Sequence, residues 1–450
     1  MKRRNFLKGI LLATAGVRSG NTQINNQSLF GPLIADPETI LDLPKEFTYQ
    51  IIARVGDEMD DGLLVPGRAD GMHAFKGPEG KIIIICNHEN HPTSFSHGPF
   101  GKENERLGLI DQNLVYDFGK GKTPSTGGTT SIVYNPMTKK TERQYLSLAG
   151  TEINCAGGPT PWGSWLSCEE TFKNPGTAFE GNLVVEREKR HGYIFEVPIT
   201  SKKSVKPVPL KAMGRFEHEA ASVDPVSGFI YLTEDKHRSL FYRFTPNVPK
   251  KLSRGGQLQA LSIVEKPSFD TRNWFSRQME EGKWMSTNWI NLNDVDSNSN
   301  DLRLRGYDQG AAIFARGEGI CYADDSFFFT ATIGGTERMG QIFEYRPNRT
   351  NNKNEAGHIR LITESTTNSL LRHADNLVMS PWGDLIICED TFEHCGLVGI
   401  KPNGEQYTLA DNPYTDSELA GICFSPDGLI MFVNIQERGL TLAISGPWSS

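Results

Sequence analysis

Short apolar runs bounded by turns recur along the chain. Residues 160–172 read TPWGSWLSCEETF and residues 380–392 read SPWGDLIICEDTF. In both segments a Pro-x-Gly turn precedes a mostly apolar run, a cysteine and two adjacent carboxylates. The copies lie more than two hundred residues apart, and a repeat at such a distance indicates a repeat architecture.

Four further segments follow the same order of turn, apolar strand and polar or acidic tip. They are residues 78–89, 224–235, 324–332 and 425–437, of which 324–332 lacks the acids. A short strand-like segment precedes each turn, so each unit is predicted to be a hairpin. The polar and acidic groups then lie at the open end of both of its strands.

Additional strand-like runs complete each unit. They occur near Tyr134 and at residues 192–197, 240–244 and 342–345. Six four-stranded units arranged radially predict an all-β fold, a six-bladed β-propeller of four-stranded antiparallel sheets. A stacked β-helix would need a shorter and more even period. The excess length falls in polar insertions that we predict as top-face loops: residues 90–130, 246–310 and 346–370.

Composition supports many short strands and excludes one class of partner. The 45 glycines and 25 prolines are typical of a turn-rich chain, in which 37% of the residues are hydrophobic. The formal net charge of −7 provides no basic surface for nucleic acid. Seven cysteines, odd in number and unevenly spaced, do not indicate a disulfide framework.

Propeller geometry brings equivalent positions of the inner hairpins together at the central axis. The residues just before and just after these hairpins are expected to converge: Asp70, Asn87, Glu89, Cys155, Glu169, Glu217, Glu219, Glu234, Glu318, Asp375 and Glu389. Any one acid alone is explained as well by a surface or turn position. If all of these carboxylates meet at the axis, their mutual repulsion raises their pKa values and opposes folding. Cations must therefore lie among them. Arg316 provides one positive charge, and metal ions are the expected remainder.

Cys155 differs from the cysteines that follow the turns. It lies in the polar, glycine-rich run Asn154-Cys-Ala-Gly-Gly, where other units place an acid. Because calcium and magnesium prefer oxygen, a thiolate among carboxylates indicates a transition metal. The alternative is a turn cysteine without a role. Cys168 and Cys388, in contrast, are expected to be small buried hydrophobic residues. Of Glu169 and Glu170, strand alternation directs one to the axis and the other away.

The N-terminus resembles a twin-arginine export signal, with Arg3-Arg4 followed by Asn-Phe-Leu-Lys. The apolar run at residues 9–17 is too short to span a bilayer. We therefore expect a signal peptide and linker at residues 1–28, a single catalytic domain at residues 29–450, and no stable membrane span. The resemblance implies export in the folded state to the periplasm or the medium. A merely basic terminus is the alternative.

Several motifs resemble, in order, those of the PhoX-type alkaline phosphatase family. They are Asn87-His-Glu89, Asn154-Cys-Ala-Gly-Gly, Thr160-Pro-Trp-Gly, Cys168-Glu-Glu170, Gly214-Arg-Phe-Glu-His-Glu219, Tyr231-Leu-Thr-Glu-Asp235, Phe314-Ala-Arg-Gly-Glu318, Asp375-Asn376 and Val433-Asn-Ile-Gln436. The resemblance implies an exported, monomeric six-bladed propeller that depends on iron (Fe³⁺) and calcium (Ca²⁺). In that family an oxygen-bridged cluster of these metals binds the phosphate group.

The resemblance also implies roles for particular residues of this chain. Cys155 would bind iron, and Glu217, Glu219, Glu318 and Asp375 would be carboxylate ligands. Glu89 and Glu169 would complete the metal ligands, and Arg316 would bind the phosphate oxygens as the catalytic and substrate-binding residue. The chain departs from the family at Arg316-Gly-Glu318, where Arg-Pro-Glu is usual, and at Glu437-Arg-Gly, where His-Pro-Gly is usual. It is also shorter than typical members, which leaves its substrate range open.

The expected function is hydrolysis of small phosphate monoesters for phosphate acquisition. Two alternatives remain open at this point. A calcium-dependent lactonase or esterase on a similar propeller would need calcium but no thiolate ligand. A non-catalytic propeller would use metals only to hold its axis together. Metal content separates the three hypotheses.

Overall fold

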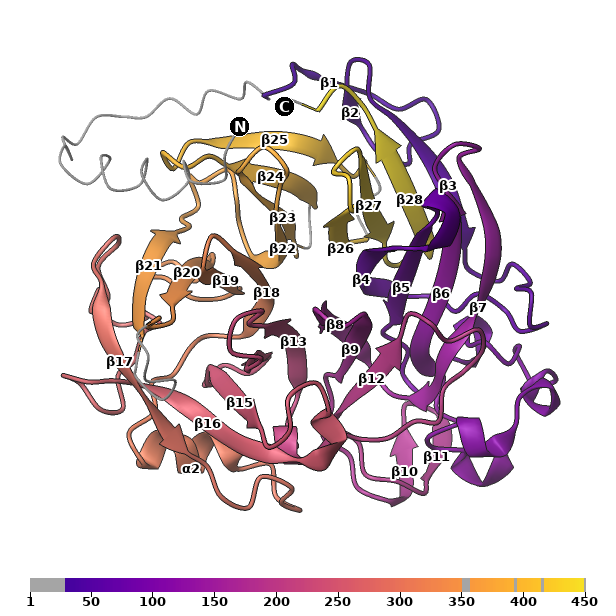
Figure 1. Cartoon of the computed structure of the whole chain (residues 1–450), viewed down its shortest axis with the longest axis horizontal. Helices are drawn as coiled ribbons and strands as arrows, with labels where there is room; N and C mark the ends of the chain where they lie inside the picture. Colours follow the sequence, from indigo (N-terminus) through magenta and orange to yellow (C-terminus); the bar gives the residue numbers. More distant parts are fainter. Residues whose placement is uncertain (1–28, 350–356, 392–394, 414–416, 449–450) are drawn as a thin grey trace.

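The computed structural model describes residues 29–349, 357–391, 395–413 and 417–448. Within these ranges, six short strands surround a central axis (Figure 1). They are β4 (Ala69–Lys76), β8 (Asn154–Pro159), β13 (His218–Val223), β18 (Gly317–Ala323), β22 (Ala374–Met379) and β26 (Leu419–Phe424). Each packs beside the next in this order, and β26 packs beside β4, which closes the ring.

Each inner strand forms a hairpin with the strand that follows it in the chain. The second strands are β5 (Ile82–His88), β9 (Ser164–Glu169), β14 (Ile230–Glu234), β19 (Ser326–Ala331), β23 (Leu385–Glu389) and β27 (Ile430–Ile435). They are rich in β-branched and aromatic residues and are buried almost throughout, as expected for strands covered on both faces. All six hairpins predicted from the repeats are therefore confirmed within the described ranges.

Outer strands complete the blades, which we number from the hairpin β4–β5. Blade one adds β6 (Gly127–Asn135) and β7 (Lys140–Thr151), and blade two adds β12 (Ile194–Pro198). Blade three adds β15 (Tyr242–Pro246) and β16 (Gly256–Ile263), and blade four adds β20 (Gln341–Arg346) and β21 (His358–Glu364). Blade five adds β24 (Gly396–Ile400) and β25 (Gln406–Asp411), and blade six adds β28 (Leu440–Ser445). The fold is an all-β propeller.

Blade six is completed by a strand from the other end of the chain. β3 (Thr48–Arg54) pairs antiparallel with β28, with Ile51 opposite Leu442. The ring is therefore closed by the hydrogen bonds and packing of this strand pair. In Figure 1 the indigo β3 lies beside the yellow β28.

Two details differ from the predicted set of six separate four-stranded sheets. Blade two has three strands, and its edge strand makes only an isolated bridge from Phe195 to Pro209. Pro207 and Pro209 have no N–H to donate, which prevents a regular fourth strand there. In addition, β17 (Met285–Asn291) pairs with both β16 and β21, so blades three and four merge into one nine-stranded sheet.

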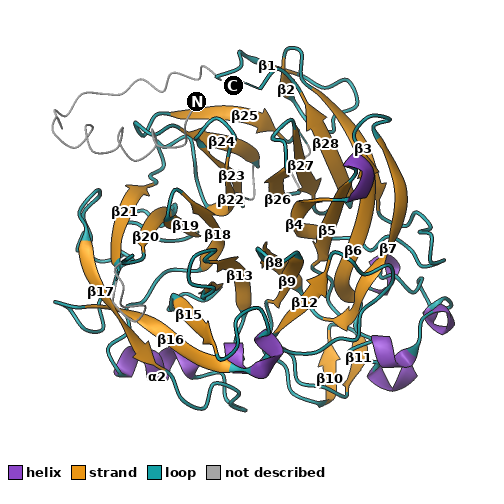
Figure 2. Ribbon diagram, in the orientation of Figure 1, coloured by secondary structure: helices purple, strands orange, loops and turns teal. Residues whose placement is uncertain are grey.

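The predicted loop insertions contain more structure than expected. Residues 246–310 include β16, β17 and the helix α2 (Leu302–Asp308) (Figure 2). Small hairpins are formed by β1 (Leu33–Ile34) with β2 (Leu43–Pro44), and by β10 (Gly176–Glu180) with β11 (Leu183–Arg187). Short 3₁₀ turns lie at residues 78–80, 95–97, 107–109, 112–114, 119–121, 211–213 and 252–254. No helix in the described ranges is long and apolar enough to cross a membrane.

The hydrophobic core lies between neighbouring blades. Between blades three and four, the rings of Phe241 and Phe329 stack with centroids 4.4 Å apart. Cys86, Cys168, Cys388 and Cys423 lie in these layers and are 2% exposed or less, which confirms the prediction for Cys168 and Cys388. None of the seven cysteines forms a disulfide. Residues 1–28, where the export signal is predicted, lie outside the described residues.

Candidate metal centre

Every inner hairpin carries a register shift near the start of its inner strand. In blade one Ala69 pairs with His88, and the next pair, Met72 with Cys86, is offset by one residue. The inner hairpins of blades two to five show the same shift, and blade six shows it one pair later, between Ala420 and Cys423. A bulge leaves a residue without a ladder partner and redirects its side chain, which is why bulges often lie beside functional sites.

The bulge places one chemically active residue of each blade at the same level of the axis. In blades one to five, these residues are Asp70, Cys155, Glu219, Glu318 and Asp375, and blade six has Ala420 there. The residue after each of them is small or carries a short side chain: Gly71, Ala156, Ala220, Gly319, Asn376 and Gly421. A Cβ on Gly71 would lie 2.5 Å from Ala156 Cα, and one on Gly421 would lie 2.1 Å from Asp70 O. Neighbouring inner strands are therefore nearly in contact at this level.

A second group of residues follows directly after the second strand of each hairpin. It consists of Glu89, Glu170, Asp235, Thr332, Asp390 and Gln436. Each donates its backbone N–H to the carbonyl of the residue just before the inner strand, as Glu89 does to Arg68 at 2.9 Å. These six hydrogen bonds are repeated around the ring and hold four further carboxylates at its acidic end.

The paired acids divide between the axis and the blade interior. Glu170 lies in the axial cluster, whereas Glu169 turns away and accepts hydrogen bonds from Gly192 N (2.8 Å) and Tyr193 N (3.1 Å). Glu169 Oε1 also lies 2.7 Å from His191 Nδ1. The predicted ligand Glu169 therefore lies outside the cluster, and Glu170 occupies the place predicted for it.

The same division occurs in blades three and five. Glu234 accepts a hydrogen bond from the Tyr242 hydroxyl (2.7 Å), and Glu389 accepts one from Arg372 N (2.8 Å). Both acids, which we expected at the axis, instead stabilise loops within their own blades. Asn87 donates to Cys155 O (3.0 Å) and so ties blade one to blade two.

Glu217 also lies apart from the axial cluster. It immediately precedes β13, level with Arg68 and Arg316 in blades one and four. Its carboxylate accepts hydrogen bonds from Asn300 Nδ2 (2.9 and 3.1 Å) and lies 3.1 Å from Lys236 Nζ. The predicted ligand Glu217 is therefore already paired with a lysine outside the axial cluster.

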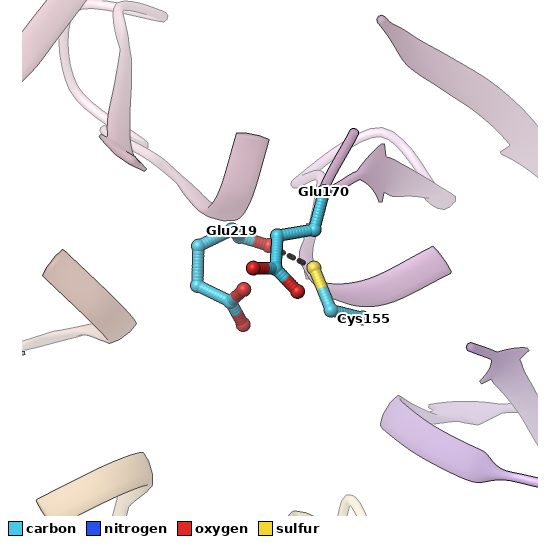
Figure 3. Close-up of side chains that lie close together, drawn as sticks. All are labelled: Cys155, Glu170 and Glu219. Atoms are coloured by element: carbon cyan, nitrogen blue, oxygen red, sulfur yellow. Dashed lines mark hydrogen bonds between the residues drawn. The ribbon is translucent and has the colours of Figure 1, made fainter. Parts of the chain in front are cut away.

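The remaining predicted ligands lie in three compact groups. Within each group of described residues, the potential ligand atoms lie within 4.8 Å of one another: Cys155 with Glu170 and Glu219, Glu219 with Glu318 and Asp375, and Asp70 with Glu89 and Glu418. Glu219 belongs to two of the groups and so links them. Figure 3 shows the three side chains close together, with the carboxylates of Glu170 and Glu219 on the same side of the Cys155 sulfur in this view. The Cys155 thiol donates to His218 O at 3.3 Å.

The electrostatics of this cluster are unbalanced. The described residues place nine carboxylates there against two guanidinium groups, Arg68 and Arg316: Asp70, Glu89, Glu170, Glu219, Asp235, Glu318, Asp375, Asp390 and Glu418. Burial, followed by repulsion from neighbouring acids, raises the pKa of Glu219 and that of Glu170 well above the usual range. The same causes raise the pKa of Asp375 to about 7. Bound cations would remove this repulsion, so the cluster fits metal ions.

Arg316 lies at the edge of the cluster. Its Nε donates to Asp235 Oδ1 (2.7 Å), and its Nη2 donates to Asp235 Oδ2 (2.9 Å) and Glu318 Oε1 (2.9 Å). Its Nη1 lies 3.9 Å from Asp390 Oδ2. The side chain is 28% exposed, so it contacts both the acids and solvent.

Four residues of the cluster are absent from the predicted ligand set: Glu170, Asp235, Asp390 and Glu418. Three of them are the second acid of an adjacent pair, and this position recurs in blades two, three and five. That recurrence marks the acid pairs in the sequence, although it does not show which member of each pair faces the axis. Glu418 immediately precedes β26, as Glu217 precedes β13, and it lies upstream of the turn of the sixth unit, where the other units also place an acid or a thiol.

A cavity lies further along the same inner strands, beyond the bulges. This cavity of about 360 Å³ is lined mostly by apolar groups, with His73 and Ser222 among the polar ones. Burial lowers the pKa of His73 to about 4, so the imidazole is neutral at ordinary pH. The cavity contains none of the clustered acids.

The fold and the candidate site together define a class of protein: a β-propeller with a cluster of carboxylates at its axis that fits metal ions. A sequence model of the family described as alkaline phosphatase PhoX matches residues 28–439. The chain therefore belongs to the PhoX alkaline phosphatase family, whose members are metal-dependent phosphatases.

One of the solved structures that this chain resembles shows the same fold. PhoX from Pseudomonas fluorescens in complex with vanadate, a transition state analogue, superposes with a TM-score of 0.68 at 17% identity, covering 94% of this chain and 98% of that one. A gluconolactonase from Xanthomonas campestris has a TM-score of 0.40 at 11% identity, with 93% and 98% coverage. A virginiamycin B lyase from Staphylococcus aureus has a TM-score of 0.38 at 14% identity, with 89% and 99% coverage. Neither of the last two likenesses bears on the activity of this chain. No curated protein sequence matches it.

Proposed function

We propose that this protein hydrolyses phosphate monoesters at an axial cluster of iron and calcium held by carboxylates and Cys155. The observation that carries the proposal is the bulge position, at which five consecutive blades present a carboxylate or a thiol to one axis. The family match supports a phosphatase over the lactonase alternative. The vanadate bound by the Pseudomonas fluorescens protein is consistent with phosphoryl chemistry at such a site.

The donor types suggest how the metals would be distributed. Cys155, Glu170 and Glu219 combine sulfur with oxygen, which suits iron better than calcium. The group of Asp70, Glu89 and Glu418 offers only oxygen, as does the group of Glu219, Glu318 and Asp375, and oxygen donors suit calcium. When bound, such ions polarise phosphoryl oxygens and supply a nucleophile at neutral pH.

Arg316 would neutralise the charge on the transferring phosphoryl group. Asp235 and Glu318 fix its guanidinium plane through three hydrogen bonds, while no hydrogen bond engages Nη1 among the described residues. A planar, permanently charged group with free N–H donors matches two phosphate oxygens better than an ammonium group does. The neighbouring carboxylates raise the pKa of Arg316, so its charge is constant over the working pH range.

We also propose that the protein acts outside the cytoplasm as a monomer. The support is the twin-arginine pattern at residues 3–8, a route that carries folded proteins, and a site whose metals would be bound before export. Fractionation of cells producing the chain, with Arg3 and Arg4 both replaced by lysine as control, tests the export route.

The decisive test of function is elemental analysis combined with turnover. The purified protein should contain iron and calcium and release phosphate from p-nitrophenyl phosphate. Cys155→Ser should lose the iron and the activity while the fold survives by circular dichroism. Cys168→Ala, which removes a cysteine from the apolar core, should retain both. Full activity of Cys155→Ser would refute the role of the cysteine, and calcium alone with lactone turnover would refute the phosphatase.

A further inference from the structure

Arg68 occupies in blade one the position that Arg316 occupies in blade four, on the opposite side of the axis. Arg68 and Arg316 each precede an inner strand, and each accepts the backbone hydrogen bond that recurs around the ring. Both have positive φ angles (46° and 56°), and both side chains are 28% exposed. β4 and β18 are three blades apart in the ring of six, so these arginines lie across the axis from each other (Figure 1).

The guanidinium of Arg68 is held by hydrogen bonds that use only some of its N–H groups. Nε donates to Glu89 O (3.1 Å), Nη2 donates to Glu89 Oε2 (2.7 Å), and Nη1 donates to Glu437 Oε1. A guanidinium has five N–H groups. Two N–H groups of Arg68 therefore have no hydrogen-bond partner among the described residues.

The two carboxylates that hold Arg68 differ in exposure. The Glu89 side chain is 14% exposed and belongs to the axial group with Asp70 and Glu418, whereas Glu437 is 46% exposed. An exposed ion pair of this kind is worth little, so an incoming anion can displace Glu437 from Arg68 at small cost. Glu437 also lies in the motif that departs from the family pattern, in Glu437-Arg-Gly.

We propose that Arg68 binds a second anionic group of the substrate, a carboxylate or phosphate on the leaving group. This inference rests on the proposed phosphatase function, in which Arg316 receives the phosphoryl group that is transferred. The preferred substrates are then phosphate monoesters whose alcohol portion carries its own negative charge. Glu437 competes with that charge for Arg68.

A purely structural role for Arg68 makes a different prediction. If it only neutralised Glu89, its removal would weaken hydrolysis of every phosphate ester by the same factor. A role in binding the leaving group changes the ratio between two substrates that differ only in that group. This ratio, measured on one enzyme sample, is independent of how much of the sample is loaded with metal.

The experiment compares 3-phosphoglycerate, which carries a carboxylate, with glycerol 3-phosphate, which does not. The full-length, metal-loaded protein is used, and kcat/KM is measured for both. In Arg68→Gln the ratio of kcat/KM (3-phosphoglycerate over glycerol 3-phosphate) should fall about tenfold or more, as expected for loss of a charge-assisted hydrogen bond. In Glu437→Gln, which keeps Arg68, the ratio should rise. Arg143→Gln on the outer strand β7 is the matched control for loss of one charge.

The outcomes separate this inference from the proposed function. If the wild-type protein hydrolyses neither these two substrates nor p-nitrophenyl phosphate, the proposed function fails. If it hydrolyses p-nitrophenyl phosphate but not 3-phosphoglycerate, this inference alone is overturned. If 3-phosphoglycerate and glycerol 3-phosphate are both hydrolysed but the ratio is unchanged in Arg68→Gln, this inference alone is again overturned. If Arg68→Gln does not fold, Glu437→Gln decides: a ratio equal to that of the wild-type protein overturns the proposal, and a raised ratio supports it.

Discussion

Strand alternation determines which acid of a pair reaches the axis. In Glu169-Glu170, the first residue ends β9 and faces the blade interior, and the second lies beyond the strand beside Cys155. Glu169 is fully buried and accepts hydrogen bonds from three backbone N–H groups, those of Glu152, Gly192 and Tyr193. Two identical side chains in adjacent positions therefore have separate roles, one in stability and one in the metal centre.

Neutral substitutions of these two acids should separate the roles. Glu170→Gln should reduce bound metal and phosphatase activity by at least about tenfold, because even partners outside the ligand set typically cost that much. Its melting temperature without metal should be at least that of the wild-type protein, since a repelling charge is removed. Glu169→Gln should instead lower the free energy of unfolding by about 1.5–3 kcal/mol, the value of hydrogen bonds to a charged group.

Each variant is the control for the other. Metal content by elemental analysis and unfolding by urea are measured on both proteins and on the wild-type chain. Equal loss of metal in the two variants, or a large loss of stability in Glu170→Gln alone, would contradict the division of roles.

At the scale of the element, the inner hairpin with its bulge is the repeated functional unit. The bulge turns Asp70 and its counterparts toward the axis, and a small residue after it lets the next inner strand approach. The inner strands of blades six and one approach closely at Gly421. This residue has a φ of +65°, and its Cβ position lies 2.1 Å from Asp70 O.

Gly421→Ala should therefore destabilise the protein by more than a simple positive-φ substitution. A left-handed conformation costs an alanine about 1–2 kcal/mol, and the contact with Asp70 O adds overpacking of about 1–3 kcal/mol. Gly404→Ala is the matched control, because Gly404 has a φ of +86° and nothing lies within 4 Å of its Cβ position. Urea unfolding should show a clearly larger loss for Gly421→Ala, and Asp70 should bind metal less well. Similar losses in both variants would show that the close approach is unimportant.

The hairpins were predictable because their signals are local. A turn signal and a mostly apolar run lie within about a dozen positions in all six described units, and in four of them the turn is Pro-x-Gly, at residues 78–80, 161–163, 381–383 and 426–428. The bulges carry no such signal, so the identity of the axial acid in each pair could not be read from the repeats alone. The pairing of β17 with both β16 and β21, and the loss of a strand at Pro207 and Pro209, depend on contacts between blades.

At the scale of the whole molecule, the ring must close around a concentration of like charge. Closure depends on the pairing of β3 with β28 and on the packing of β26 beside β4, and the axis holds many more carboxylates than guanidinium groups. In the absence of cations the acids repel one another across all six blades. Metal binding and global stability should therefore be coupled, since a ligand that binds only the folded state stabilises it.

This coupling gives a pH dependence whose sign follows from the pKa shifts. Folding raises the pKa of Asp375 from 3.8 to about 7, because of burial and then the charge of Asp390, and the pKa values of Asp70 and Glu318 also rise. A carboxyl group with a raised pKa binds its proton more tightly in the folded state. Its effect on stability is most favourable below the unfolded pKa of about 4 and is lost as the pH rises through about 7.

The melting temperature of the metal-free protein should consequently fall between pH 5 and pH 8. Addition of calcium and iron should raise it and flatten this slope, because bound cations favour the ionised carboxylates. Asp375→Asn, prepared without metal, should show a shallower slope than the wild-type protein, since one of the titrating groups is removed. Scanning calorimetry of the chelated and reloaded proteins across this pH range provides the measurement. Parallel curves for the two forms would mean that the axial acids do not hold the metals, because cations bound elsewhere would leave the titration of the axial acids unchanged.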